Sequence, residues 1–263
     1  MRDSYRVAWR AMADGSGVRT LFPAIIPPGA THVHGVNSAS PAVERFLPIV
    51  AGAMSSILND LAIRISQKSA LTIDSVRRLY APDPYHPLVP RLILRVLRLT
   101  CLTDAYAALW EDAWDEGFIN DEWLLGKTHP GAPVLGDVGP HWTASTPLRR
   151  DLDRRNALVE IDALMATMLG VTADELSTIY RTQFPVLYGY DQNDYIYDAN
   201  GRLVPTQVRQ LWRKKGDKLT VQERTATHPA GTIYAYELPF APETARPTSA
   251  LRCRGSPARL IDG

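Results

Sequence analysis

Cysteine is scarce in this sequence, and neither sign of charge is in excess. The two cysteines, Cys101 and Cys253, are too few for a disulfide framework or a zinc site, and they suit a reducing compartment, so we expect a cytoplasmic protein. Lysine and arginine together number 29, against 28 for aspartate and glutamate. The overall charge therefore predicts no nucleic-acid partner, and such a partner has to be inferred from local clusters of cations.

A long apolar run is also missing. The longest candidate, residues 43–65, is interrupted by polar and charged side chains, among them Arg45, Asn59, Asp60 and Arg64. A membrane-spanning helix needs about 20 predominantly apolar residues, so we expect no membrane partner. The charged N-terminus also lacks the apolar core of a signal peptide. With 263 residues, the chain has material for one large domain or two smaller ones.

The most informative stretch is residues 4–30. Its two apolar segments, 5–10 and 20–26, are separated by the turn-forming run at 14–17, and the second ends at a Pro-Pro-Gly stop. The first segment carries alternating cations around a tryptophan. This pattern predicts a strand pair or a strand–helix unit with a basic edge that bears an aromatic side chain.

Apolar residues recur at helical steps farther along the chain. The predicted helices are residues 43–65, opened by Ser40-Pro41; 92–114, with a break near 100–103; 149–169, closed by Gly170; and 172–181, opened by a capping box of Thr172 and Glu175. Residues 126–147 contain four glycines and four prolines and predict a linker or an extended wrap. Residues 198–201 predict the turn of a hairpin.

Several side chains could belong to a catalytic or metal site but have a simpler interpretation. His32 and His34 could ligate a metal from one face of a strand, but no further ligand is near in sequence, so we expect surface strand histidines. Glu160 and Asp162 stand two residues apart on a predicted helix and point to different faces, which favours structural roles. The acidic residues within 111–116 predict a solvated helix end.

The densest basic patch lies in residues 208–218, where Arg213, Lys214 and Lys215 follow Trp212. Cations clustered beside an aromatic side chain are typical of phosphate contact, so these three cations are candidate DNA-binding residues. A solvated helix end is the alternative.

Three segments together resemble large adenine-N6 DNA methyltransferases, two of them the target recognition region and the third a segment that lies C-terminal to it. In residues 4–30, Tyr-Arg-x-x-Trp-Arg is followed by Arg-Thr-Leu-x-x-Ala-Ile-Ile-Pro-Pro-Gly. Residues 54–83 contain Asn-Asp-x-x-x-Arg on a predicted helix, although Tyr-Ala-Pro stands where the family has Leu-Pro. Residues 154–176 contain Glu-Ile-Asp-Ala-Leu and Asp-Glu-Leu. By this resemblance, the closest relatives are type IIG restriction–modification enzymes and the methyltransferases of BREX- and DISARM-type phage defence.

The resemblance implies that the chain binds double-stranded DNA, with four further candidate DNA-binding residues: Arg6, Arg10, Arg19 and Arg64. The first three lie on short segments that could hold a planar guanidinium against a base edge. For Arg19 the alternative is a buried ion pair, for example with Asp3 or Asp14. For Arg64 it is a helix C-terminal cation that interacts with the helix dipole.

The catalytic motifs of that family are absent from the sequence. There is no Gly-rich loop after a predicted strand to hold S-adenosylmethionine, and no Asn/Asp-Pro-Pro-aromatic motif to hold a flipped adenine. Glu-x-Lys of metal-dependent nucleases and Gly-x-Ser-x-Gly are absent too. We therefore expect no catalytic, cofactor-binding or metal-binding residue in this chain. It would be the C-terminal piece of a larger enzyme, whose catalytic methyltransferase chain or domain binds S-adenosylmethionine.

The expected fold class is α+β, mainly helical with a small N-terminal sheet. Its expected parts are a target-recognition-like domain at 1–125, a linker at 126–147, a helical and hairpin region at 148–240, and a disordered tail at 241–263. The expected function is the DNA-recognition, or specificity, part of an adenine-specific DNA methyltransferase or type IIG restriction enzyme in phage defence, inactive by itself. The alternative is a non-catalytic protein–protein interaction module of a defence complex that uses the helix faces of 43–65 and 158–169.

Overall fold

A computed structural model describes residues 3–126, 129–228 and 230–242. Its opening stretch forms a three-stranded antiparallel sheet of β1 (Arg6–Arg10), β2 (Pro23–Ile26) and β3 (Val36–Ala39), with β1 in the centre. Side chains alternate between the faces of a strand, so Val7 and Trp9 point into the core, where both are at most 2% exposed. The predicted strand pair is confirmed.

The loop between β2 and β3 carries His32 and His34, which were predicted to lie on a strand. Both are exposed, but they precede a turn in which Gly35 takes φ 110°, so β3 begins only at Val36. The prediction of a strand at these two residues is therefore wrong, because the left-handed backbone of Gly35 ends the extended conformation there.

The helix predicted over residues 43–65 is two helices, which corrects that prediction. After the 3-10 turn η1 (Glu44–Phe46) come α1 (Leu47–Ser55) and α2 (Ile57–Ser66), bent by 65°. The bend lies at Ser56, whose ψ of 148° is extended and whose side chain caps α2 by accepting a hydrogen bond from the Asn59 backbone N–H. Helical spacing of the apolar residues continues across the bend and does not reveal it.

The helical region predicted over 92–114 breaks where expected. This region contains α4 (Val89–Thr100), η2 (Asp104–Tyr106) and α5 (Ala107–Asp112). The short helix α3 (Ile73–Val76) precedes it, and η3 (Glu116–Asn120) follows it. Cys101 ends α4 with a ψ of 59°. The acidic residues within 111–116, at the end of α5 and just after it, are exposed, as predicted for a solvated helix end.

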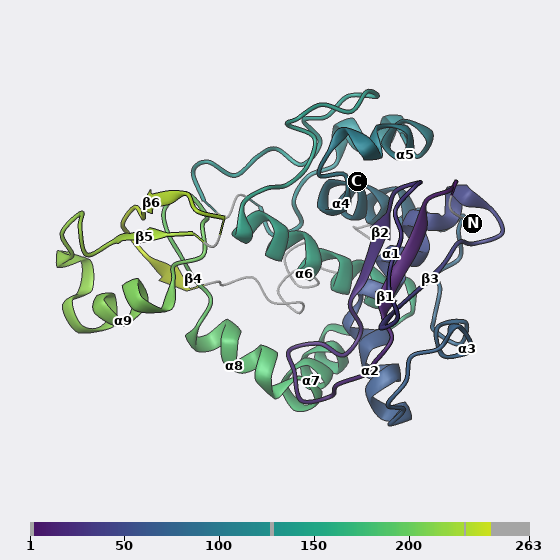
Figure 1. Cartoon of the computed structure of the whole chain (residues 1–263), viewed down its shortest axis with the longest axis horizontal. Helices are drawn as coiled ribbons and strands as arrows, with labels where there is room; N and C mark the ends of the chain where they lie inside the picture. The colour runs from purple at the N-terminus through teal and green to yellow at the C-terminus, as the bar shows by residue number, and fades with distance from the viewer. Residues whose placement is uncertain (1–2, 127–128, 229, 243–263) are drawn as a thin grey trace.

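The central element is α6 (Asp151–Met168), which packs against α1, α2 and α4 (Figure 1). Gly170, at φ 71°, follows its end, and the predicted capping box then opens α7 (Ala173–Gln183). The largest hydrophobic core joins side chains of β1, β2, α1, α4 and α6. Segments on both sides of the Gly/Pro-rich residues 126–147 therefore share one core.

The C-terminal elements are α8 (Pro185–Asn193), β4 (Ile196–Tyr197), α9 (Thr206–Lys215), η4 (Gly216–Lys218), β5 (Thr225–Thr227), β6 (Ile233–Ala235) and β7 (Ala241–Pro242). Apart from α8, they surround a separate small core, at the left in Figure 1. The predicted turn at 198–201 is present, with Gly201 at φ 75°. The chain segments before and after it form only the Tyr197–Leu203 bridge, because β4 pairs with β7 instead. Of the predicted disordered tail, residues 243–263 lie outside the described residues.

Residues 129–147 form the extended wrap that the composition allowed. Arg98 of α4, 2% exposed, donates to the backbone carbonyls of Val134, Leu135 and Thr146 at 2.7–3.0 Å. No carboxylate of the described residues forms an ion pair with it, and burial lowers the pKa of Arg98 to about 10. Backbone carbonyls therefore accept the hydrogen bonds of this guanidinium, and Asp153 and Asp137 favour its charge without pairing with it.

At the level of fold class, the structure is α+β, with helices and small antiparallel sheets. Among the described residues, no single helix has the length and apolarity needed to cross a membrane; the bent pair Glu44–Ser55 and Ile57–Ser66 meets the requirement only when both parts are taken together.

Charged side chains deep in the largest core link α6 to its neighbours. Arg95 of α4 is fully buried and donates from Nε to Glu160 of α6 at 2.7 Å and from Nη1 to Asp121 at 2.5 Å. Burial opposes the charged form of Arg95, but the two carboxylates outweigh that effect and raise its pKa.

Replacing Arg95 with Met should leave Glu160 buried without a counter-ion and Asp121 with only Arg91, whose Nε is 3.7 Å away. Breaking a buried ion pair by removing one partner costs about 3–5 kcal/mol, so we expect that loss in the free energy of unfolding, measured by urea denaturation. The matched control is Arg77→Met, whose partner Asp74 is 77% exposed, and it should cost less than about 0.5 kcal/mol. Equal losses in the two variants would contradict a stabilising role for Arg95.

Candidate functional site

The predicted DNA-binding residues Arg19 and Arg64 lie together around the ring of Phe184. Their guanidinium carbons are 5.9 and 4.2 Å from the ring centroid. Arg19 Nη2 donates to Asp162 of α6 at 2.8 Å, and Arg64 Nε donates to Asp60 at 3.1 Å. Both arginine side chains are only 12–13% exposed. The partner of Arg19 is thus Asp162, 143 residues away in sequence, and neither Asp3 nor Asp14.

The carboxylate of Asp60 fixes the chain that follows Arg19. It accepts the backbone N–H of Thr20 at 2.8 Å and that of Leu21 at 3.2 Å. Arg64 adds hydrogen bonds to the carbonyls of Gly17 and Gln183 at 2.8 and 2.9 Å. These contacts hold the connection between β1 and β2 against α2 and the end of α7, so Arg64 has three protein acceptors instead of the helix dipole alone.

Arg6 is held on the outer face of the sheet. It is 5% exposed, and its Nη2 donates to the carbonyl of Ala30 at 2.6 Å. His32 Nε2 lies 2.8 Å from the hydroxyl of Ser38 on β3. The two contacts close the β2–β3 loop over this face, so the described structure gives Arg6 an internal role. Arg10, at the end of β1, is exposed instead.

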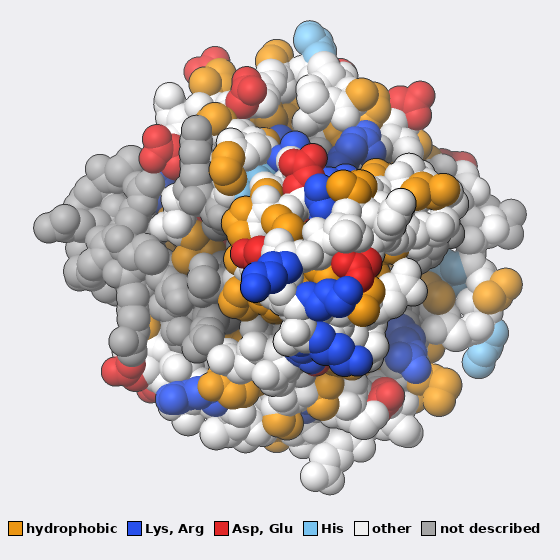
Figure 2. Space-filling view, turned by 90° about the vertical axis from the view of Figure 1, so that its left-hand side faces the viewer, with side chains coloured by type: hydrophobic (Ala, Val, Ile, Leu, Met, Phe, Trp, Pro, Cys, Tyr) orange, Lys and Arg blue, Asp and Glu red, His pale blue; other side chains and the backbone are white. Residues whose placement is uncertain are grey.

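The basic patch of residues 208–218 lies on α9 and η4. Arg213 donates to the backbone carbonyl of Asn193, Lys215 pairs with Glu223, and each is about half exposed, at 48% and 50%. Lys214 is exposed and forms no ion pair with another described residue. Figure 2, which faces this end of the molecule, shows Lys and Arg side chains gathered near its middle with a few acidic ones between them. As DNA contacts, all seven predicted residues stay predictions.

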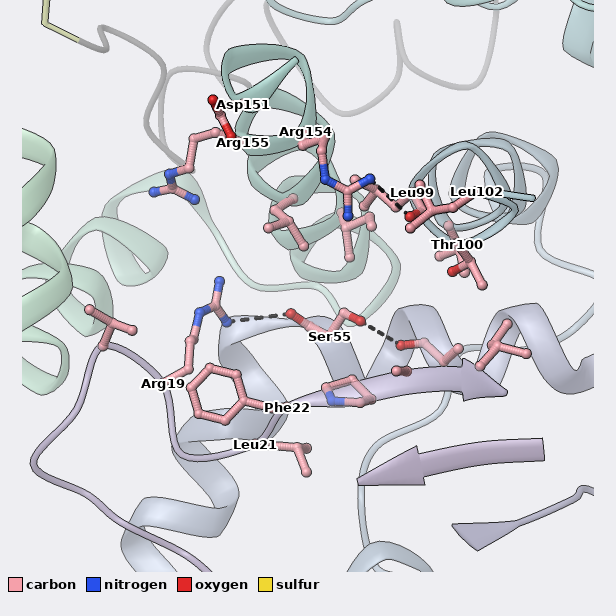
Figure 3. Close-up of a pocket in the computed structure, with 18 of the residues that line it drawn as sticks. Arg19, Leu21, Phe22, Ser55, Leu99, Thr100, Leu102, Asp151, Arg154 and Arg155 are labelled. Atoms are coloured by element: carbon pink, nitrogen blue, oxygen red, sulfur yellow. Dashed lines mark hydrogen bonds between the residues drawn. The ribbon is translucent and has the colours of Figure 1, made fainter. Parts of the chain in front are cut away.

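The sequence did not point to a cleft of about 600 Å³ beside α6 (Figure 3). Its walls come from β2, α1, the end of α4, the first turns of α6, α8 and β4. Most of the lining is apolar or aromatic, including Phe22, Tyr106, Leu158 and Tyr195. Arg19, Arg154 and Arg155 add guanidinium groups from opposite walls (Figure 3).

These three cleft arginines differ in their counter-ions. Arg19 pairs with Asp162, and Arg155 pairs with Asp191 at 2.6 Å. Arg154 donates from Nη1 to two backbone carbonyls, those of Leu99 and Leu148, each at 3.0 Å. Burial lowers the pKa of Arg154, partly offset by Asp151. In sequence, Arg154 and Arg155 belong to a run of mixed charge, and this pattern does not predict that they line a cleft.

The remaining candidates for chemistry have structural partners. Glu160 and Asp162 are fully buried in ion pairs, in agreement with the structural roles predicted for them. His129 lies 2.9 Å from Asp153 of α6, and burial raises the pKa of that carboxyl although His129 lowers it. Burial also raises the pKa of the Cys101 thiol to about 12, which keeps it protonated. Within residues 3–126, 129–228 and 230–242, no cluster of three His, Cys, Asp or Glu has the geometry of a metal site.

No protein-family model, curated protein or solved structure matches the chain.

Replacing Arg19 with Met should unfold the protein more readily. Asp162 is fully buried, and burial raises its pKa in spite of Arg19 and Arg155, so removing Arg19 leaves a buried carboxylate without its ion-pair partner, which costs about 3–5 kcal/mol. Urea denaturation at neutral pH measures the loss.

The double variant Arg19→Met, Asp162→Asn is the control. The amide oxygen of Asn can still accept the Ile57 N–H, which now donates to Asp162 at 2.6 Å, while the buried charge is gone. This variant should recover most of the loss. A stable Arg19→Met protein would contradict the structural assignment and favour a role in DNA contact.

Proposed function

We propose that this chain is the DNA-recognition part of an adenine-specific DNA methyltransferase or type IIG restriction enzyme in phage defence. It would act with a separate catalytic methyltransferase chain or domain that binds S-adenosylmethionine. The resemblance of residues 4–30, 54–83 and 154–176 supports this function. The fold is compatible with it, because the opening stretch forms a small sheet packed rigidly on helices.

The observation that carries the proposal is the excess of cations on α9 and η4. Residues 206–223 contain five lysines and arginines against two carboxylates. Among these cations, Lys214 and Lys218 are exposed and form no ion pair with other described residues. Flexible ammonium groups free of internal partners are suited to phosphate contact, which supplies most of the affinity for DNA irrespective of sequence.

A solvated helix end explains these cations less well. The C-terminus of a helix carries a dipole equivalent to about half a negative charge, which one cation can complement. The last turn of α9 already has three cations, Arg213, Lys214 and Lys215, and Lys218 follows in η4. The positive charge therefore exceeds what the helix itself can stabilise.

The protein–protein alternative would have to use only part of the helix faces on which it was based. Several apolar side chains of α1 and α2, among them Leu47, Ile57 and Ile63, are buried in the chain's own cores, whereas Val43 and Ile65 are 45% and 68% exposed. Ile161 and Leu164 of α6 are buried as well. A protein partner would have to use the exposed side chains or another surface.

Replacing Arg213, Lys214 and Lys215 together with Ala should weaken the salt dependence of duplex binding. For the unaltered protein we expect about three to five phosphate contacts, each adding about 0.9 to the slope of log K against log salt. The variant should lower the slope by about two units or more, measured by fluorescence anisotropy with a labelled duplex between low and physiological salt.

The matched control removes the same charge from the far end of the molecule, where α3 lies (Figure 1). Lys68, Arg77 and Arg78 are exposed, and their triple Ala variant should keep the slope of the unaltered protein. An unchanged slope in the α9 variant, or an equal drop in both, would place the DNA elsewhere.

Alone, the chain should neither bind S-adenosylmethionine nor methylate DNA. The expectation rests on the sequence, which encodes neither the Gly-rich loop nor the Asn/Asp-Pro-Pro-aromatic motif that the reaction requires. Isothermal titration calorimetry of the purified protein tests it, and stoichiometric binding of the cofactor would refute it.

A further inference from the structure

Among the three guanidinium groups of the cleft, only that of Arg154 forms no ion pair with a described residue, although Asp151, which also lines the cleft, partly favours its charged form. Arg154 projects from the first turns of α6, and its hydrogen bonds to the described part of the chain, both from Nη1, go to the carbonyls of Leu99 and Leu148. No carboxylate of the described residues lies within ion-pair distance of it. Figure 3 shows the guanidinium directed into the cleft between the opposing walls.

The other charges around the cleft are already paired. Arg19 and Arg155 are neutralised by Asp162 and Asp191, both at most 1% exposed. Asp151, also in the lining, is exposed and accepts the backbone N–H of Leu203 at 3.0 Å. Arg154 therefore keeps two of its nitrogens, Nε and Nη2, available for an anionic group that enters the cleft.

The rest of the lining suits an apolar or aromatic body. The apolar and aromatic lining includes Phe22 of the β1–β2 connection, Leu102, Tyr106, Leu158 and Tyr195. Phe22 and Leu102 are 46% and 39% exposed, so a ligand would remove apolar surface from water. A cleft of about 600 Å³ is in the range of small-molecule sites, which combine apolar walls with few polar groups.

We propose that this cleft is a binding site for a small organic anion, in which a carboxylate or phosphate pairs with Arg154 and an apolar or aromatic body lies against Phe22, Tyr106 and Tyr195. None of the α9 cations lines the cleft, so binding of this anion is separate from the DNA binding proposed above.

A series of naphthalene derivatives tests the site, because they share one ring system and differ in charge. The probes are 1-naphthoate, 1-naphthyl phosphate, neutral 1-naphthalenemethanol and cationic 1-naphthylmethylammonium, with binding to the full chain measured by equilibrium dialysis. At least one acid should bind one-to-one, about tenfold or more tighter than the alcohol, and the ammonium compound weakest. The tighter of the two acids identifies the anionic group. Failure of both acids to bind, or equal binding of acid and alcohol, would overturn the proposal.

Arg154→Gln should weaken binding of the preferred acid by about 10- to 100-fold and leave the alcohol unchanged. The matched control is Arg149→Gln, since Arg149 also donates to backbone carbonyls but lies outside the cleft lining; it should bind the acid normally. Normal acid binding by folded Arg154→Gln would overturn the proposal.

If Arg154→Gln does not fold, the variant Ala24→Trp tests the site instead, by blocking the cleft. Ala24 is an exposed residue of β2 in the cleft lining, far in sequence from Arg154, and an indole there would occupy the cleft. Loss of acid binding in this variant supports the site, and unchanged binding overturns it.

Discussion

The pairing of buried charges along α6 is the constraint on which the arrangement of the other elements depends. This helix is buried on nearly every side, yet it carries Asp153, Arg155, Glu160 and Asp162 among its buried residues. Each of these four charges meets a partner from a different part of the chain: His129, Asp191 of α8, Arg95 of α4 and Arg19. A rotation or one-residue shift of α6 would separate all four pairs at once, so they fix its register and the positions of its neighbours.

Such pairs are a weak source of net stability, because desolvating both partners offsets much of their attraction. Burial raises the pKa of Glu160 and Asp162 in spite of their arginines, which shows that desolvation dominates at both carboxyls. Their contribution is specificity of packing. Alternative arrangements would leave a charge in the core without a partner, which costs far more than a loss of apolar contact.

Local signals in the sequence predicted many of the helices and strands, but they did not predict contacts between residues far apart in the chain. The strand pair at β1 and β2, the break after α4 and the capping box of α7 follow from turn residues, caps and apolar spacing, all readable within a few residues. At the bend, the Ile57 backbone N–H donates to Asp162 of α6 and the Asn59 side chain donates to the Tyr80 carbonyl, contacts that no local pattern encodes. Likewise, the ion pair of Arg19 spans 143 residues, and the cleft forms only where β2, α1, α4, α6, α8 and β4 meet.

Arg98 has a consequence for how the chain could be divided. Its guanidinium donates hydrogen bonds to backbone carbonyls within residues 134–146. The composition of that stretch is typical of a flexible connection between independent units. Two polypeptides made by cutting within 126–147 would therefore each expose half of the core that α4 and α6 share. Neither half would be expected to fold in isolation, whereas the two mixed together could complement each other in the manner of a split protein.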